Sequence, residues 1–91
     1  MIVIGGGISG LACARFILDR IPGVDLRLVE ASGNFGGNIR TDYSQGFVTE
    51  LGPTGFLNQH RSTLALAETV GLSDDIISGC ERMRRRYIFW R

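Results

Sequence analysis

Residues 1–10 read Met-Ile-Val-Ile-Gly-Gly-Gly-Ile-Ser-Gly, and this stretch decides the fold of the chain. Its first four residues form an apolar run that opens onto Gly5, which predicts a buried parallel strand entering a tight turn. Apolar residues at helical spacing from Ser9 to about Ile21 predict a crossover helix. A second apolar run at residues 26–29 predicts another strand, which ends at Glu30. We therefore expect a right-handed βαβ unit, the start of a Rossmann-type α/β domain.

The three spaced glycines of the pattern GxGxxG each meet a separate demand in a dinucleotide-binding turn. Gly5 permits the tight turn, Gly7 lets the backbone approach a pyrophosphate, and Gly10 lets the helix pack closely on the strand. The helix would also direct its free N–H groups and its positive dipole end at that anion. The spacing alone is weak, but here it follows a strand, opens a helix and precedes a carboxylate at Glu30. We predict that the pyrophosphate lies on Gly5, Gly6, Gly7, Ile8, Ser9 and Gly10.

The choice among dinucleotides depends on two further features. Glu30 lies at a strand end, where its carboxylate can accept hydrogen bonds from both ribose hydroxyls of an adenosine. An acidic side chain there would repel a 2′-phosphate, which disfavours NADP. A second glycine pair, Gly36-Gly37, with Arg40 three residues later, would approach the pyrophosphate from the other side. Without the first motif this pair is simply a flexible loop with a surface arginine; with it, FAD is favoured over NAD.

The residues after the βαβ unit predict short strands and helices. Two strand-like runs, Ile39–Tyr43 and Phe47–Leu51, flank Ser44-Gln45-Gly46 and predict a hairpin. Ser73 is expected to cap a brief helix that ends at Ser78, and Tyr87–Trp90 is β-prone.

A longer helix is predicted between the hairpin and the brief helix. Asn58 is expected to be its N-cap, and the helix should run through Val70. Gly71 is expected at C′, with Leu72 placed to touch Ala67, as in a Schellman motif.

Composition excludes several classes of function. A chain of 91 residues with 44% hydrophobic and 21% charged residues is a small globular domain rather than a disordered chain or a coiled coil. The net charge of +1 gives no field that would favour nucleic acid or an anionic membrane as the main partner. Two cysteines without CxxC spacing and a single histidine indicate neither a metal site nor a disulfide scaffold. Without a signal peptide or a membrane span, we expect a cytoplasmic location.

Several motifs together resemble the protoporphyrinogen oxidases, within the family of flavin-dependent amine oxidases and phytoene desaturases. The resemblance rests on GGGISG at 5–10, VEAS at 29–32, FGGNIRT at 35–41, GF at 46–47, ELGPTGFL at 50–57, LAETVGL at 66–72 and RRRYIFW at 84–90. It implies FAD as the cofactor and oxidation of protoporphyrinogen IX to protoporphyrin IX, a step of heme biosynthesis. It runs along the whole chain but covers only about the first fifth of such an enzyme.

The resemblance also assigns residues to parts of the cofactor. Glu30 and Ala31 would hold the adenosine ribose, and Asn38 would lie beside the cofactor where the family often has a bulkier residue. Thr54 replaces the family's usual arginine or similar residue in a segment expected against the flavin end. The remaining predicted cofactor contacts are Gly37, Arg40, Gly52, Pro53, Thr54 and Gly55.

One substrate contact is implied as well. Arg86 resembles the family arginine that pairs with a propionate of the tetrapyrrole, which suits a planar, bidentate donor. The rest of the basic cluster, Arg82, Arg84 and Arg85, is more simply a solvated face. No residue is a convincing acid, base or nucleophile, so we predict no catalytic side chain here and no metal ligand.

The resemblance has consequences for the chain as a whole. Residues 1–91 would be the N-terminal part of an FAD-binding domain, without the substrate domain and the returning FAD segment. We expect the isolated chain to be inactive and poorly soluble, with an exposed sheet edge. Family membership also suggests loose, peripheral membrane association.

Two alternatives stay open. An amine oxidase or a carotenoid desaturase would share every cofactor motif. A non-catalytic binding module that kept the fold and lost its flavin, as in the Rab GDP-dissociation inhibitors, is disfavoured by the intact glycines and Glu30.

Overall fold

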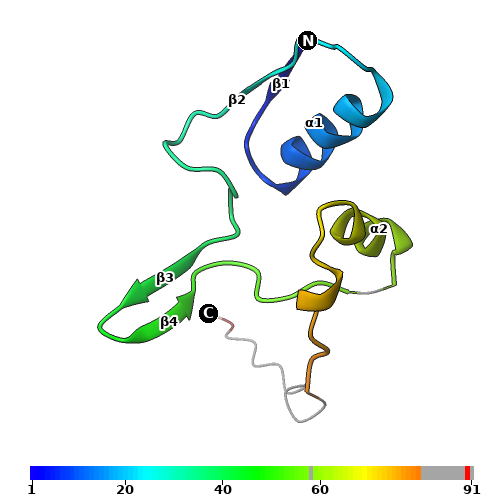
Figure 1. Cartoon of the computed structure of the whole chain (residues 1–91). Helices are drawn as coiled ribbons and strands as arrows, with labels where there is room; N and C mark the ends of the chain where they lie inside the picture. The colour runs from blue at the N-terminus through cyan, green and yellow to red at the C-terminus, as the bar shows by residue number, and fades with distance from the viewer. Residues whose placement is uncertain (58, 81–89, 91) are drawn as a thin grey trace. The chain divides into compact units, whose positions relative to one another are not determined.

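The computed structural model describes residues 1–57, 59–80 and 90 (Figure 1). The chain divides into two compact units, Met1–Leu57 and Asn58–Arg91. The second unit contains the helix α2 (Arg61–Thr69) and the 3₁₀ helix η1 (Ser73–Asp75). The elements of the first unit are β1 (Ile2–Ile4), α1 (Ile8–Arg20), β2 (Arg27–Val29), β3 (Thr41–Ser44) and β4 (Phe47–Glu50).

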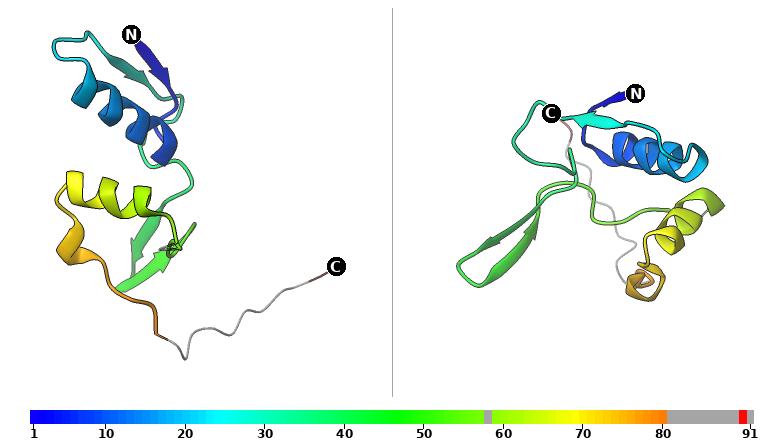
Figure 2. Two further views of the ribbon diagram at one scale, coloured as in Figure 1. Left: turned by 90° about the vertical axis from the view of Figure 1, so that its right-hand side faces the viewer. Right: turned by 45° about the horizontal axis from the view of Figure 1, so that its top comes forward.

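The first unit begins with the predicted βαβ motif. β1 and β2 pair in parallel, with Ile2 opposite Arg27 and Ile4 opposite Val29, and α1 connects them. Both views of Figure 2 show α1 running beside this strand pair. The predicted α/β class and the partial Rossmann-type architecture are confirmed, with the helix starting one residue earlier than expected.

The predicted burial of the first strand is wrong for most of its residues. Val3 is buried, as is Ala14 on α1, and these two are the buried apolar residues of the described chain. Ile2 and Ile4 are 65% and 86% exposed. Successive side chains of a strand point to opposite faces, and within residues 1–57 α1 is the one helix packed on the pair β1–β2. A fully apolar strand therefore has one covered and one uncovered face here.

The predicted hairpin is confirmed as β3 and β4, which pair antiparallel with Ser44 opposite Phe47. Gln45 and Gly46 form the two-residue turn, with φ of +51° and +81°. Positive φ at both positions is the geometry of a type I′ turn, which matches the twist of the flanking strands.

The second unit confirms the predicted end of the long helix but not its start. α2 begins at Arg61, and its N-cap position is His60 without a side-chain hydrogen bond. The predicted cap, Asn58, lies outside the described residues. At the other end, Gly71 has φ of +75°, and its N–H donates to the Glu68 carbonyl at 3.0 Å.

The Leu72 N–H donates to the Ala67 carbonyl at 2.8 Å, which completes the predicted Schellman motif. The brief helix that follows is shorter than expected. η1 ends at Asp75, and its N-cap position is Leu72, so the prediction of Ser73 as a cap is wrong. Leu72 is the last residue of the Schellman motif and directly precedes η1, so it occupies the N-cap position of η1. Of the predicted final strand, residues 87–89 lie outside the described residues.

Candidate cofactor site

The first glycine loop joins β1 to α1. Gly5 has φ of +98°, a conformation that side chains strongly disfavour, and its N–H donates to the Val29 carbonyl at 2.7 Å. A Cβ added to Gly5 would meet no atom within 4 Å among the described residues. Glycine is therefore needed at position 5 for its backbone conformation and not for lack of space, as the sequence predicts.

Gly10 meets the third demand of the motif. A Cβ at this position would overlap the carbonyl oxygen of Gly5, and it would lie 3.7 Å from Cγ1 of Val3. Both the oxygen and the helix backbone are fixed parts of the turn. Gly10 is thus required for the close approach of α1 to the end of β1.

The start of α1 suits an anion. Gly7 is its N-cap, no side chain caps it, and its first turn contains no acidic residue. The N–H groups of Ile8, Ser9 and Gly10 have no acceptor within the helix, because they belong to its first turn. A Cβ on Gly7 would meet a single neighbour within 4 Å in the described chain, Cα of Gly37 at 3.9 Å. Open space beside uncapped donors fits the pyrophosphate of a dinucleotide.

The second glycine pair lies directly against the first loop. The Gly36 N–H donates to the Gly6 carbonyl at 2.8 Å, and Gly7 and Gly36 form a parallel β-bridge. A Cβ on Gly37, which has φ of +61°, would come within 3.1 Å of Cα of Gly7. Two loops far apart in the sequence therefore meet with only backbone between them, as the predicted approach from the other side requires.

Arg40 follows this second loop, and its side chain is exposed. Its carbonyl accepts the Leu51 N–H at 2.8 Å, which extends the hairpin pairing. The one ion pair found within the described residues, Arg15 with Asp19, does not involve Arg40. Its guanidinium is therefore uncommitted to any described carboxylate.

The Glu30 carboxylate accepts hydrogen bonds from other residues of the chain. Its Oε2 accepts the Gly6 N–H at 2.5 Å, and its Oε1 accepts both the N–H and the Oγ–H of Ser32 at 2.8 Å. The backbone hydrogen bonds from Ser32 and then Gly6 lower the pKa of Glu30 from 4.5 to about 2. The sequence predicts a ribose-binding carboxylate here, but it did not reveal these two protein partners.

We predict that the stability contributed by Glu30 disappears in acid. Since its pKa is lower in the folded state, this stabilisation is present above pH 4.5 and is lost as the pH falls from 4.5 toward 2. Glu30→Gln should therefore flatten the acid part of a plot of urea midpoint against pH.

Asp25→Asn is the matched control, because the Asp25 side chain makes no hydrogen bond within the described residues. It should follow the wild-type curve. Superimposable acid limbs for wild type and Glu30→Gln would contradict the assignment.

Gly6 has a role that the sequence analysis missed. It is buried, and a Cβ there would lie 2.5 Å from Cδ1 of Phe35 and 3.0 Å from Oε2 of Glu30. The aromatic ring covers the middle of the glycine loop, although the Phe35 side chain is itself 63% exposed. The sequence feature that could have indicated this contact is the aromatic residue Phe35 directly before the pair Gly36-Gly37.

Gly6→Ala is expected to destabilise the protein by about 1–2 kcal/mol, because the new methyl group displaces the ring and crowds the carboxylate. The exposed ring of Phe35 can rotate away, so Phe35→Ala in the same chain should recover part of the loss. Urea unfolding of both single variants and the double variant measures this coupling. Strictly additive losses would show that the ring does not cause the effect.

The segment expected at the flavin end shows one close contact. A Cβ on Gly52 would overlap the carbonyl oxygen of Asn38, so the structure brings these two predicted residues together. Pro53, Thr54 and Gly55 are exposed, as is Ala31. Arg86 lies outside the described residues.

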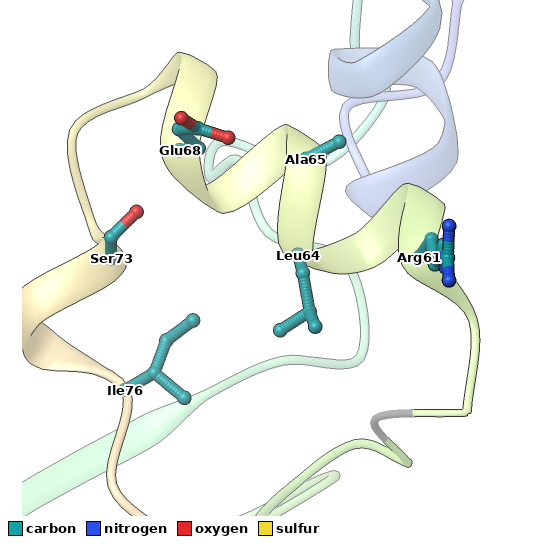
Figure 3. Close-up of a pocket in the computed structure, with 6 residues that line it drawn as sticks. All are labelled: Arg61, Leu64, Ala65, Glu68, Ser73 and Ile76. Atoms are coloured by element: carbon teal, nitrogen blue, oxygen red, sulfur yellow. The ribbon is translucent and has the colours of Figure 1, made fainter.

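The second unit has a separate hollow of about 490 Å³ beside α2 and η1 (Figure 3). The side chains of Leu64 and Ile76 project into it. It contains none of the predicted site residues, and its lining consists of Arg61, Leu64, Ala65, Glu68, Ser73 and Ile76.

Two kinds of feature are missing from residues 1–57, 59–80 and 90. They contain no group of three or more His, Cys, Asp or Glu side chains arranged to hold a metal ion. None of their helices combines the length and the apolar character needed to cross a membrane.

Comparison with known proteins agrees with the predicted resemblance. The chain is 41% identical over 78 residues to Coproporphyrinogen III oxidase of Propionibacterium freudenreichii, which covers 86% of this chain and 14% of that protein. The enzyme of the same name from Staphylococcus aureus is 37% identical over 76 residues, covering 84% and 16%. Protoporphyrinogen oxidase 1, chloroplastic, of Arabidopsis thaliana is 34% identical over 91 residues, covering 98% and 17%.

This chain thus spans 14% to 17% of the length of these relatives. The sequence profile of the family described as "Flavin containing amine oxidoreductase" matches residues 8–91. That description includes a flavin, which confirms the class of cofactor predicted from the glycine loops. The chain therefore belongs to the flavin containing amine oxidoreductase family.

Proposed function

We propose that this chain holds the ADP half of FAD in an oxidoreductase that acts on a porphyrinogen. The observation that carries the proposal is the meeting of two glycine loops at the uncapped start of α1, where Gly36 bonds to Gly6. Backbone on both sides and free N–H groups between them suit a pyrophosphate. When bound, FAD would accept hydride equivalents from the reduced macrocycle.

The proposed residues divide by the part of the cofactor they would serve. Glu30 and Ala31 would serve the adenosine ribose, and Arg40 would face the pyrophosphate as a cation. Asn38 and the segment that begins at Gly52 would serve the flavin end. The pyrophosphate itself would rest on the loop Gly5, Gly6, Gly7, Ile8, Ser9 and Gly10, with Gly37 opposite.

The proposed substrate is protoporphyrinogen IX, and coproporphyrinogen III is the second candidate. The observation in support of this second candidate is the identity to the two bacterial coproporphyrinogen III oxidases, 41% and 37%. Both are reduced tetrapyrroles with propionate groups.

The test uses the full-length protein. The purified protein should be yellow, with an absorbance band near about 450 nm, as a bound flavin gives. Its rates with protoporphyrinogen IX, coproporphyrinogen III and a polyamine should favour one of the two porphyrinogens. A colourless protein that takes up no FAD would support a non-catalytic module, and a preference for the polyamine would support an amine oxidase.

We also predict a substrate role for Arg86. If its guanidinium pairs with a substrate propionate, Arg86→Ala should raise KM about tenfold or more and leave flavin content unchanged. Arg82→Ala is the matched control from the same basic cluster and should leave KM unchanged. An unaltered KM for Arg86→Ala would remove this assignment.

A further inference from the structure

Two donors from one residue fix the position of the Glu30 carboxylate. The Ser32 N–H and the Ser32 Oγ–H both reach Oε1 at 2.8 Å. The other oxygen, Oε2, accepts the Gly6 N–H. The carboxylate is therefore held between the turn that follows β2 and the loop that precedes α1, with both oxygens engaged.

The Ser32 hydroxyl has two acceptors within hydrogen-bond distance. Its oxygen lies 2.9 Å from the carbonyl oxygen of Asn34 as well as 2.8 Å from Oε1 of Glu30. A hydroxyl has a single hydrogen to donate, and an ionised carboxylate is the stronger acceptor of the two. The hydrogen bond to Glu30 is therefore the dominant one, and the Asn34 carbonyl is a competing acceptor for the same hydrogen.

We infer that Ser32 is a positioning residue that holds the Glu30 carboxylate in the orientation needed to accept a ribose hydroxyl. This inference rests on the proposed function, since Glu30 is the proposed ribose acceptor. A carboxylate offers about four lone-pair sites, of which three are used by Gly6 and Ser32. The remaining lone pair of the Glu30 carboxylate points in a defined direction only while those donors fix the plane of the carboxylate.

The recognised group is the ribose 2′-hydroxyl of an adenine nucleotide, so the effect of Ser32 should depend on that hydroxyl. Loss of one hydrogen bond to the carboxylate is expected to weaken nucleotide binding about five- to tenfold. A ligand that lacks one ribose hydroxyl should lose less, because it gains less from an oriented carboxylate.

The experiment measures competition with FAD for the full-length protein after removal of its flavin. The probes are ADP and 2′-deoxy-ADP, and the variants are Ser32→Ala, Ser32→Cys and Ser32→Thr. Ser32→Ala and Ser32→Cys should weaken ADP binding about five- to tenfold and reduce the preference for ADP over 2′-deoxy-ADP. Ser32→Thr keeps the hydroxyl and should restore both quantities.

Two further variants separate positioning from general structure. In a Glu30→Gln background, Ser32→Ala should have little additional effect, because the carboxylate it positions is gone. Ser78→Ala is the matched control, since the Ser78 side chain makes no hydrogen bond within the described residues, and it should bind like wild type.

The outcomes distinguish this inference from the proposed function. If Ser32→Ala and Ser32→Cys keep the full preference for ADP over 2′-deoxy-ADP while the wild type binds FAD, the positioning role is wrong and the proposed function stands. If Ser32→Thr fails to restore binding, or the effects of Ser32→Ala and Glu30→Gln add fully, the role is also wrong. If the wild type binds neither FAD nor ADP, the proposed function fails, and the inference fails with it.

Discussion

Gly10→Ala is expected to abolish flavin retention by the full-length protein and to destabilise it by about 3 kcal/mol or more. The new methyl group would occupy the place of the Gly5 carbonyl oxygen, with the Gly5 carbonyl carbon 3.0 Å away. The carbonyl oxygen and carbon of Gly5 cannot rotate aside, because both belong to the backbone of a tight turn. α1 would have to move away from β1, which separates the uncapped helix start from the second glycine loop.

Flavin content per protein and the urea midpoint measure this effect. Gly33→Ala is the matched control, since a Cβ there meets no atom within 4 Å in the part of the chain that the structure describes, and its φ is not positive. That change should stay within about 0.5 kcal/mol of wild type. Full flavin content in Gly10→Ala would refute the close approach seen between α1 and the end of β1.

Gly52→Ala is expected to have the second largest effect. Its methyl group would overlap the Asn38 carbonyl oxygen and lie 2.9 Å from the Asn38 carbonyl carbon. This contact comes directly after the hydrogen bond from Leu51 to Arg40, so relief would require the chain to break that pairing. We expect a loss of about 2–3 kcal/mol, as for other insertions into a space without room.

A matched control for Gly52→Ala comes from the same residue type. A Cβ on Gly79 meets no atom of the described residues within 4 Å, so Gly79→Ala should unfold at the wild-type urea concentration. If Gly52→Ala also unfolds at that concentration, the approach of Gly52 to Asn38 is wrong. A stable Gly52→Ala protein with altered flavin absorbance would instead assign the position to the cofactor alone.

Much of the fold could be predicted from the sequence because its determinants are local. A tight turn needs positive φ at Gly5, a two-residue hairpin needs it at Gly46, and a Schellman motif needs it at Gly71. Each requirement is set within a few residues by backbone sterics. Hydrophobic periodicity then indicated the strands and helices between these turns.

The errors in prediction came from the same dependence on local pattern. The apolar run of β1 predicted burial on both faces, but burial depends on which other elements cover the strand. The start of α2 was placed at a residue type that favours N-caps, whereas His60 holds that position without a side-chain cap. The preference of a residue type for a helix cap is weaker than the tertiary constraints on the chain between two elements.

The sequence by itself determined that this chain has a βαβ unit with a glycine loop, a carboxylate at Glu30 and a second glycine pair. Only the tertiary structure decided what those residues touch. Gly6 donates to Glu30 across 24 positions, and Gly36 reaches back to Gly6. Such contacts arise when whole elements pack, and no local spacing encodes them. For that reason the candidate cofactor residues could be predicted from the pattern, while the contacts of Gly6 with Glu30 and Gly36 could not.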